Sequence, residues 1–214
     1  MKDLGSYRKS YDQNELVESN LIENPFDFFN KWFQEVEQFG GIEEVNAMTI
    51  STIGIDNFPK SRIVLLKQIE ENGFVFYTNY NSEKGKSILK NPKVSMSFFW
   101  PNLERQVIIK GIAEKTSSKN SDDYFNSRPK GSQMGALVSP QSEIIPNREF
   151  LEKRLTDFES EFQNKTVPRP ENWGGFLVKP ISFEFWQGRP NRLHDRIRYT
   201  IQSDLSWKTE RLAP

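Results

Sequence analysis

The apolar residues divide the chain into a polar start, one amphipathic helix and a long series of short strands. Residues 1–23 are polar and lack regular apolar spacing, which predicts a mobile arm or lid. Asn24 and Pro25 then form a helix-start signal, and Gly40-Gly41 form a stop signal. Between them, apolar side chains recur on one helical face at Phe29, Trp32, Phe33 and Val36. This helix is expected to lie on a hydrophobic core.

Short strands rich in β-branched and aromatic residues dominate residues 47–116. The expected strands are AMTISTI, SRIVLLK, FVFYT, KVSMSFFW and ERQVIIKGIAEKT. Turn signals separate them, and only one short helix is expected in this region, at about 83–90. A parallel sheet would need a helix in each connection between strands. The pattern therefore predicts antiparallel hairpins, as in a barrel.

The second half of the chain is expected to be helical at first and then to return to strands. Residues 117–163 include an apolar helical stripe at Leu151, Leu155, Phe158 and Phe162. The later strands are expected at FLVKP, SFEFWQG, RLHDRIRYTIQ and SWKTERL. The predicted fold class is mainly β with added helices, an antiparallel barrel forming a single domain over residues 24–214.

Composition permits a sizeable core and argues against several classes of protein. The chain has 17 Phe and 5 Trp, whose large side chains compensate for an apolar fraction of only 36%. Its 29 basic and 29 acidic residues balance, so no global field attracts nucleic acid or an anionic membrane. Cysteine is absent, and no apolar run resembles a signal peptide or a membrane span. We therefore expect a soluble, cytoplasmic protein.

The segment RLHDRIRY places basic side chains at alternate positions. This segment is expected to be a strand, and the period of two then puts four side chains on one face: Arg192, His194, Arg196 and Arg198. Such a row needs a facing anion, which could be a phosphate, a flavin or a row of carboxylates. A solvated strand face with crossed salt bridges explains the pattern equally well.

Metal and hydrolase chemistry are poorly supported. With 1 His and no Cys, the usual ligand set of a zinc site is missing, and no metal is expected. The sequence contains neither a G-x-S-x-G elbow nor a glycine-rich phosphate loop. A bound phosphate would therefore have to be held by side chains.

Two groups of side chains in the first half could hold an anion. Arg62 and Lys67 bracket the apolar strand RIVLLK, although solvated strand ends are the commoner situation. Lys84 opens a short helix after Thr78, where helix N–H groups would add hydrogen-bond donors.

Two further candidates lie in the second half. Tyr124, Arg128 and Ser132 fall within YFNSRPKGS, for which a helix end followed by a turn is the commoner local interpretation. Trp186 lies in FEFWQG, where the pattern favours a core residue over a cofactor platform. The residues alone thus predict a barrel with several candidate anion sites.

The same segments resemble, in order and spacing, the pyridoxamine 5'-phosphate oxidase family, from about residue 24 to the C-terminus. The matching strings are RIVLLK, FYTN, LERQV, YFNSRP, SPQS, WGGF, FWQG, RLHDR and RLAP. This resemblance implies a split β-barrel that binds flavin mononucleotide (FMN) between the two subunits of a homodimer. It also implies oxidation of pyridoxamine and pyridoxine 5'-phosphates to pyridoxal 5'-phosphate, with O2 as acceptor and H2O2 as product.

The resemblance also implies roles for individual residues. The positions that match the family's FMN site are Arg62, Ile63, Val64, Leu65, Leu66, Lys67, Tyr77, Thr78, Lys84, Gln106, Gln141, Ser142, Trp186 and Arg196. Those that match its substrate site are Lys67, Tyr124, Arg128 and Ser132 at the phosphate, Arg192, Leu193 and His194 at the ring, and Arg8 and Tyr11 in a lid. Arg192 and His194 are the implied catalytic residues.

One position departs from the family pattern. Many members have an arginine beside the FMN-phosphate lysine, where this chain has Glu83. A carboxylate there should repel the phosphate or turn away, so we expect a slightly lower affinity for FMN.

Two other classes of protein remain open. A split barrel that stores flavin, binds heme or uses another cofactor would share the fold, but it should lack the substrate-phosphate residues present here. A barrel that only mediates protein contacts would leave the arginine row unexplained, and a yellow purified protein would exclude it.

Overall fold

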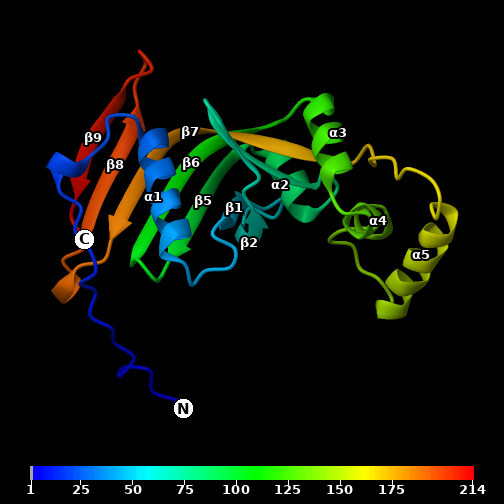
Figure 1. Ribbon diagram of the computed structural model, residues 1–214, viewed down its shortest axis with the longest axis horizontal. Coiled ribbons are helices and arrows are strands. Elements are labelled where there is room, and N and C mark those ends of the chain that lie inside the picture. Colours follow the sequence, from blue (N-terminus) through cyan, green and yellow to red (C-terminus); the bar gives the residue numbers. More distant parts are fainter. Residues whose placement is uncertain (1) are drawn as a thin grey trace. The chain divides into compact units, whose positions relative to one another are not determined.

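The computed structural model describes residues 2–214 and confirms a mainly antiparallel β fold with added helices (Figure 1). The strands of the described chain are β1 (Ala47–Ile53), β2 (Pro59–Leu65), β3 (Gln68–Glu70), β4 (Gly73–Asn79), β5 (Lys93–Trp100), β6 (Arg105–Lys115), β7 (Trp173–Gln187), β8 (Asp195–Ile201) and β9 (Trp207–Leu212). Its helices are α1 (Pro25–Phe39), α2 (Glu83–Lys90), α3 (Ser118–Ser127), α4 (Lys130–Val138) and α5 (Arg148–Glu161), with short 3-10 turns η1 (Glu18–Asn20) and η2 (Pro190–Arg192).

Hydrogen bonding joins the strands in the order β2-β1-β5-β6-β7-β4-β3, with β8 paired to β7 and β9 paired to β8. Internal contacts divide the chain into two compact units. Unit 1 comprises the residues up to Ile50, Ser95–Gly111 and Pro180–Pro214. Unit 2 comprises Ser51–Val94 and Ile112–Lys179. Strands β1, β5, β6 and β7 contribute residues to both units, and each unit is described separately below.

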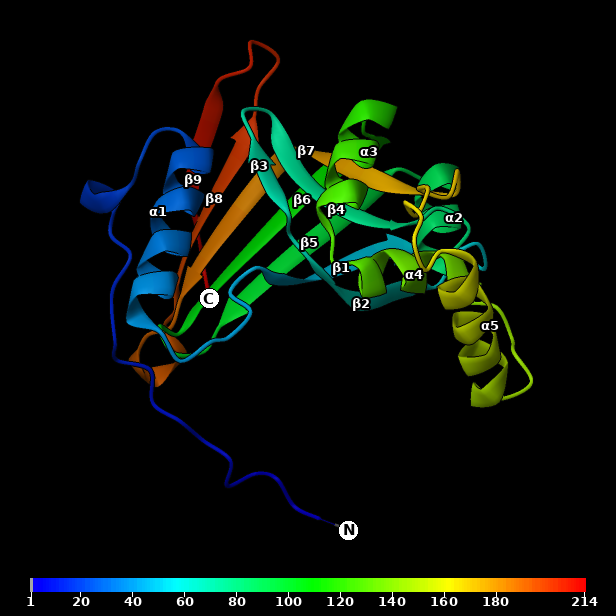
Figure 2. The same ribbon diagram turned by 45° about the vertical axis from the view of Figure 1, so that its right-hand side comes forward.

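In unit 1, helix α1 covers one face of the strands, as Figures 1 and 2 show. The helix begins where the side chain of Asn24 accepts the N–H of Phe26, and it ends at Gly40, whose φ of 75° suits glycine. Its apolar face is buried, as the periodicity predicted. The ring centroids of Phe28 and Phe185 lie 4.4 Å apart, and those of Trp32 and Phe185 lie 5.2 Å apart. An aromatic core therefore joins α1 to β7.

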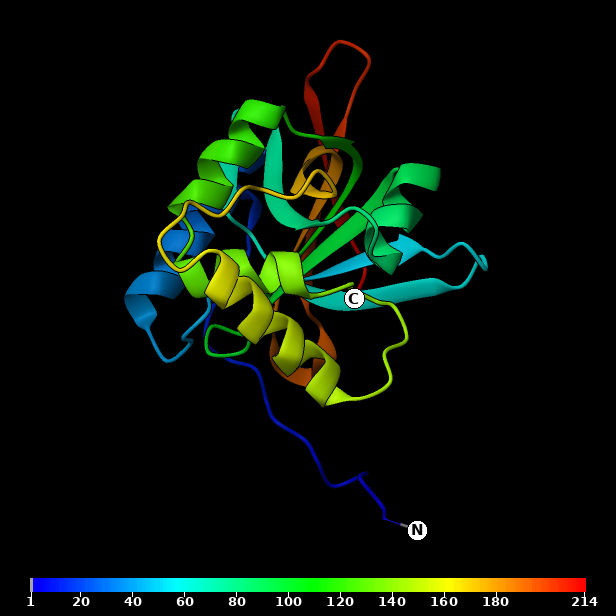
Figure 3. The same ribbon diagram turned by 90° about the vertical axis from the view of Figure 1, so that its right-hand side faces the viewer.

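In unit 2, the buried strand β4 pairs antiparallel with the first half of β7, with Tyr77 opposite Gly175. Helices α4 and α5 lie side by side in Figure 3. A buried cluster of Phe125, Met134, Val167 and Trp173 forms their core. Part of the predicted α5 stripe, Leu155, Phe158 and Phe162, packs against this cluster.

Strand β7 differs from the prediction because it is one strand of 15 residues, where two strands were expected. Pro180 lies after the segment that pairs with β4 up to Val178 and before the segment that pairs with β8 from Ser182. Neither of these ladders needs the N–H that proline lacks.

The predicted strand RLHDRIRYTIQ was wrong at its start. Residues 190–192 form η2, with Asn191 and Arg192 at φ values of 57° and 62°, and β8 begins only at Asp195. Arg192 and His194 therefore do not belong to a strand face shared with Arg196 and Arg198. The turn that starts at Pro190 extends further than its sequence signal indicated.

Part of the N-terminal segment packs on unit 1 without any apolar periodicity. Leu16 is 2% exposed, and its N–H donates to the carboxylate of Asp195 at 3.0 Å. Further along, the Tyr199 hydroxyl donates to the carbonyl of Ile22 at 2.9 Å. Polar contacts and one buried leucine thus hold a segment whose sequence shows no helix or strand pattern. Within the described residues, none of the helices is both long and apolar enough to cross a membrane.

Replacing Phe28 by alanine should lower the free energy of unfolding by about 3–5 kcal/mol, because it leaves a cavity in the aromatic core of unit 1. Phe28 is 1% exposed, whereas Phe39 on the same helix is 56% exposed. Phe39→Ala is therefore the matched control and should change stability by less than about 0.5 kcal/mol. Denaturant unfolding measures both, and equal losses would contradict this account of the core.

Candidate functional site

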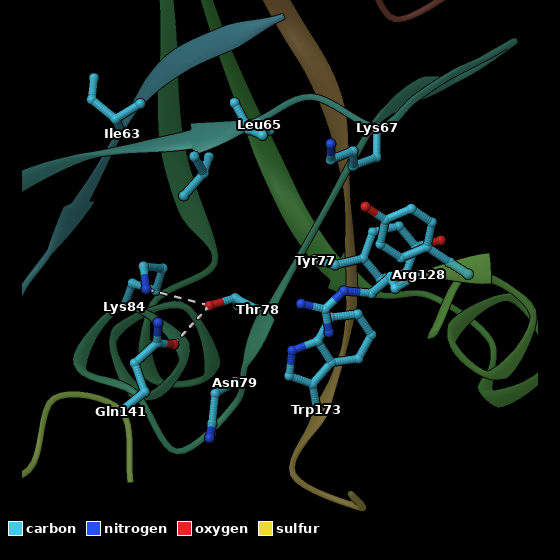
Figure 4. Close-up of a pocket in the computed structure, with 12 residues that line it drawn as sticks. Ile63, Leu65, Lys67, Tyr77, Thr78, Asn79, Lys84, Arg128, Gln141 and Trp173 are labelled. Carbon is cyan, nitrogen blue, oxygen red and sulfur yellow. Dashed lines mark hydrogen bonds between the residues drawn. The ribbon is translucent and has the colours of Figure 1, made fainter. Parts of the chain in front are cut away.

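A cavity of about 280 Å³ lies in unit 2, between the end of β2, the end of β4 and the helical segments (Figure 4). Ten of its lining residues were predicted as site residues: Ile63, Val64, Leu65, Lys67, Tyr77, Thr78, Lys84, Tyr124, Arg128 and Gln141. The other two, Asn79 and Trp173, were not predicted as site residues. Residues from distant parts of the chain thus meet at one cavity.

Three aromatic rings form a stack in this cavity. The rings of Tyr77 and Tyr124 lie 3.9 Å apart with an interplanar angle of 19°, and Trp173 lies 5.6 Å from Tyr77 at 12°. Burial, and next the neighbouring Tyr124, raise the pKa of Tyr77 to about 12. Both tyrosines therefore stay protonated at neutral pH and can donate hydrogen bonds.

The stack depends on a glycine and on an arginine outside the cavity. A Cβ atom at Gly175 would lie 2.9 Å from Cε1 of Tyr77, so a larger residue would displace that ring. Arg169 donates to the carbonyl of Trp173 at 2.6 Å and to the carboxylate of Asp122 on α3, also at 2.6 Å. The string WGGF was the sequence signal for this part of the site, but its tryptophan was read only as a family match.

Arg128 brings a partly buried positive charge into the cavity. Its guanidinium lies 4.6 Å from the centroid of the Trp173 ring, and its Nη1 atom is buried without a hydrogen-bond partner in the described structure. Burial lowers the pKa of Arg128, because a charged group loses hydration there. A buried donor without an acceptor is costly, so an anion bound at Nη1 would offset that cost.

A second cationic region surrounds Lys84. Its Nζ donates to the Thr78 hydroxyl at 3.3 Å, and that hydroxyl donates to Gln141 at 3.3 Å (Figure 4). Burial lowers the pKa of Lys84, and the positive charge of Arg62 lowers it further. Arg62 itself donates to the Thr52 hydroxyl at 2.8 Å. Two neighbouring cations that destabilise each other's charge form a natural site for an anionic group.

Glu83, the departure from the family pattern, is paired with Lys60. The Lys60 Nζ lies 2.6 Å and 2.5 Å from the two carboxylate oxygens. Lys60 thus neutralises much of the negative charge that Glu83 brings next to Lys84.

Four predicted residues of unit 2 do not line this cavity: Arg62, Leu66, Ser132 and Ser142. Leu66 is 4% exposed, so its side chain belongs to the core. Ser142 is exposed and has a φ of 73°. Ser132 lines an adjacent cavity of about 260 Å³, to which Arg128 also contributes.

Unit 1 contains a separate cavity of about 580 Å³. The predicted residues Arg8, Tyr11, Arg192 and His194 all line it. The Trp186 ring lies 4.7 Å from that of His194 and 5.8 Å from that of Tyr11. Trp186 is only partly buried, so the structure does not support the core position that the pattern favoured.

His194 has a defined hydrogen-bonding arrangement. Its Nδ1 accepts the backbone N–H of Arg189 at 3.1 Å. Burial lowers the pKa of His194, the positive charge of Arg192 lowers it further, and Asp195 opposes them. The neutral imidazole therefore carries its proton on Nε2, since Nδ1 acts as an acceptor.

The remaining predicted residues of unit 1 lie outside this cavity. Arg196 pairs with Glu184 at 2.8 Å and donates to the carbonyl of Ala213. Leu193 is 69% exposed, and Gln106 is partly exposed on β6. Within the described residues, no cluster of three or more His, Cys, Asp or Glu side chains could hold a metal ion.

Comparison with known proteins shows the family of the chain. The model of the family described as pyridoxamine 5'-phosphate oxidase matches residues 33–161, and that of the pyridoxine 5'-phosphate oxidase C-terminal dimerisation region matches residues 173–214. A pyridoxine/pyridoxamine 5'-phosphate oxidase from Flavobacterium johnsoniae is 67% identical over 213 residues, which cover 100% of both chains. Its counterpart from Flavobacterium psychrophilum is 60% identical over 214 residues, with 100% of both chains covered. The chain belongs to the pyridoxamine 5'-phosphate oxidase family.

Solved structures confirm the fold class. PhzG from Burkholderia lata, in complex with tetrahydrophenazine-1-carboxylic acid, has a TM-score of 0.87 at 24% identity, covering 96% of this chain and 100% of that chain. A pyridoxamine 5'-phosphate oxidase-related, FMN-binding protein from Nostoc punctiforme has a TM-score of 0.70 at 14% identity, covering 91% of this chain and 100% of that chain. The fold is the split β-barrel of this family.

The pKa of His194 should lie below the ordinary histidine value of about 6.5. Because the folded-state value is lowered, the free energy of unfolding should fall as the pH drops from above about 6.5 through the folded-state pKa. NMR titration of the imidazole Hε1 proton measures this pKa directly, because the chain has 1 histidine. Arg192→Gln should raise it by removing a neighbouring charge, and a wild-type midpoint at or above 6.5 would contradict the assignment.

Proposed function

We propose that this protein is an FMN-dependent oxidase that converts pyridoxamine and pyridoxine 5'-phosphates to pyridoxal 5'-phosphate in the biosynthesis or salvage of vitamin B6 cofactors. Pyridoxine 5'-phosphate, an alcohol, and O2 would give the aldehyde pyridoxal 5'-phosphate and H2O2. Pyridoxamine 5'-phosphate, an amine, would react with O2 and one water molecule to give the same two products and ammonia. The unpartnered Nη1 of Arg128 beside the aromatic stack is the observation that carries this proposal. It provides a site for a phosphate next to rings that can pack against a flat heterocycle.

The substrate phosphate would be held by four groups: Lys67, Tyr124, Arg128 and Ser132. Arg128 and Tyr124 lie in the same cavity, and Ser132 shares the adjacent cavity with Arg128. A phosphate fixed in this way orients the remote end of the substrate, so binding energy serves positioning.

The residues around Lys84 fit the FMN that the family implies. Lys84 and Arg62 would bind its phosphate, because burial and mutual repulsion lower the pKa of Lys84 in a way that an anion would relieve. Thr78 and Gln141 would add polar contacts. FMN held there by Lys84 and Arg62 would supply the two-electron redox chemistry that the oxidation needs, with O2 as the final acceptor.

Arg192 and His194 would act at the pyridine ring. His194 accepts from the Arg189 N–H through Nδ1, so its Nε2–H is the group that can donate to the substrate. Neutral His194 would thus orient the substrate as a hydrogen-bond donor, while the fixed charge of Arg192 would stabilise negative charge that develops on it.

We further propose a homodimer with FMN at the subunit interface. The match of residues 173–214 to a C-terminal dimerisation region supports it. A flavoprotein with another substrate is the second candidate, because PhzG combines this fold with a phenazine carboxylic acid.

Aerobic turnover of the FMN-loaded protein tests the proposal. Both 5'-phosphates should give pyridoxal 5'-phosphate and H2O2 in equal amounts. Bound FMN without either product would overturn the assignment to vitamin B6 chemistry and favour the second candidate.

Arg128→Ala should raise KM for pyridoxine 5'-phosphate by roughly 10- to 100-fold, since a hydrogen bond to a charged group contributes about 1.5–3 kcal/mol. The dissociation constant of FMN, measured by fluorescence titration, should change less than about twofold. Arg148→Ala, at an arginine whose side chain is 86% exposed on α5, should change neither value. If substrate and FMN binding weakened equally, the proposal that Arg128 binds the substrate and not FMN would be wrong.

Glu83→Arg should tighten FMN binding by roughly threefold, because partly exposed charge pairs contribute about 0.2–1 kcal/mol. Glu83→Gln should have a smaller effect in the same direction, since Lys60 already offsets the carboxylate. Titration of the apoprotein with FMN measures both, and no tightening in either variant would contradict the predicted repulsion.

A further inference from the structure

The carboxylate of Glu104 is fully buried at the start of β6 and faces the N-terminal segment. Its Oε2 accepts the N–H groups of Asp12 at 2.9 Å and Gln13 at 3.2 Å. Its Oε1 lies 2.9 Å from the Nζ of Lys9, which raises the pKa of that lysine. One carboxylate therefore fixes three residues of a segment that has no secondary structure of its own.

The backbone at this point is shaped for the same contact. Glu104 has a φ of 56°, a conformation that few residues other than glycine adopt, and its carbonyl accepts the N–H of Gly188 at 2.8 Å. A Cβ atom at Gly188 would lie 2.8 Å from the Cβ of Tyr11 and 3.0 Å from that of Glu104. Glycine here lets the N-terminal segment lie directly on the end of β7.

The contact determines where Tyr11 lies. Asp12 and Gln13 are anchored immediately after it, and Lys9 is anchored just before it. The Tyr11 ring lies 5.8 Å from the ring of His194 and at right angles to Trp186. Tyr11 is therefore held as a wall of the cavity that contains His194.

We propose that Glu104 is a positioning residue: it latches residues 9–13 so that Tyr11 closes the His194 cavity over the substrate. The kinetic part of this inference rests on the proposed function, whereas the structural part does not. No charge of Glu104 needs to reach the substrate, because its effect passes through the backbone of Asp12 and Gln13.

A second contact holds the N-terminal segment independently of Glu104, so loss of the latch can be told apart from unfolding of the whole segment. Arg211 on β9 binds Glu18 at 2.6 Å and donates to the carbonyl of Leu16 at 2.8 Å. This anchor should persist when Glu104 is changed. Loss of the latch should therefore free residues 9–13 while residues 16–18 stay in place.

Hydrogen exchange in the full-length, FMN-loaded protein tests the latch without reference to activity. Glu104→Ala and Glu104→Gln should accelerate exchange of the Asp12 and Gln13 amides, by at least about tenfold in Glu104→Ala, and leave residues 16–22 unchanged. Gly188→Ala should do the same while keeping the carboxylate, because the added methyl group meets Tyr11. Glu18→Gln is the matched control, since it weakens the second anchor and should leave both amides protected.

The NMR signal of the His194 imidazole provides a second measurement, which a general loss of stability would not change in the same way. Removing the Tyr11 ring from its neighbourhood should shift the Hε1 signal of His194 in Glu104→Gln in the same direction as in Tyr11→Ala. Unchanged exchange in all three latch variants, or an unmoved His194 signal in Glu104→Gln, would overturn the proposal.

Kinetics then test the link to catalysis. Glu104→Gln should raise KM for pyridoxine 5'-phosphate about fivefold or more, with kcat changed less than about twofold. In a Tyr11→Ala background the same substitution should add no further effect, since both act through one contact. Multiplicative effects in the double variant would overturn the positioning role. If the wild-type protein turns over neither vitamin B6 phosphate, the proposed function fails, and hydrogen exchange and the His194 signal still decide the latch.

Discussion

The candidate site of unit 2 is built on positive charge that is partly withdrawn from water. Arg128 has a buried Nη1 atom without a partner, and Lys84 lies in a partly buried site where burial and Arg62 both lower its pKa. Keeping such groups charged costs free energy that folding alone does not recover. A phosphate-bearing ligand offsets this cost, so the cationic cavity and the proposed ligands explain each other.

In unit 1 the buried charge is negative, and its partners belong to the chain itself. Glu104 is a buried carboxylate whose Oε2 accepts two backbone N–H groups and whose Oε1 forms an ion pair with Lys9, so it fixes the position of the N-terminal segment. His194 is kept neutral by burial, by Arg192 and by the donor N–H of Arg189. Arg128 and Lys84 in unit 2 thus offer positive charge to an anionic ligand. In unit 1, Glu104 positions a wall of the cavity, and the surroundings of His194 set its protonation state.

The sequence predicted the regular parts of the fold because they follow simple periodicities. Helix α1 and strands β1 and β5 begin and end where the pattern of apolar residues, caps and turn signals placed them. The errors lie where tertiary contacts override local pattern. Pro180 continues a strand between two pairing registers, and the left-handed Asn191 and Arg192 remove His194 from the strand that alternation indicated.

Prediction of the candidate site shows the same division. Residues in the strings RIVLLK and YFNSRP meet at one cavity, which only their order in a known family made foreseeable. Trp173 was missed as a site residue because it entered only through the matching string WGGF, and its place in the site depends on stacking with Tyr77 and Tyr124. Glu104 could not be predicted, because its partners are backbone groups about 90 residues away in the chain.

The ratio of kcat/KM for pyridoxine 5'-phosphate to that for unphosphorylated pyridoxine tests the central claim most directly. If the buried cations around Arg128 select the phosphate, the ratio should be on the order of 100 or more, because leaving a buried charged donor unpaired costs several kcal/mol. A ratio near one would contradict the account, since the cationic cavity would then have no part in recognising the substrate.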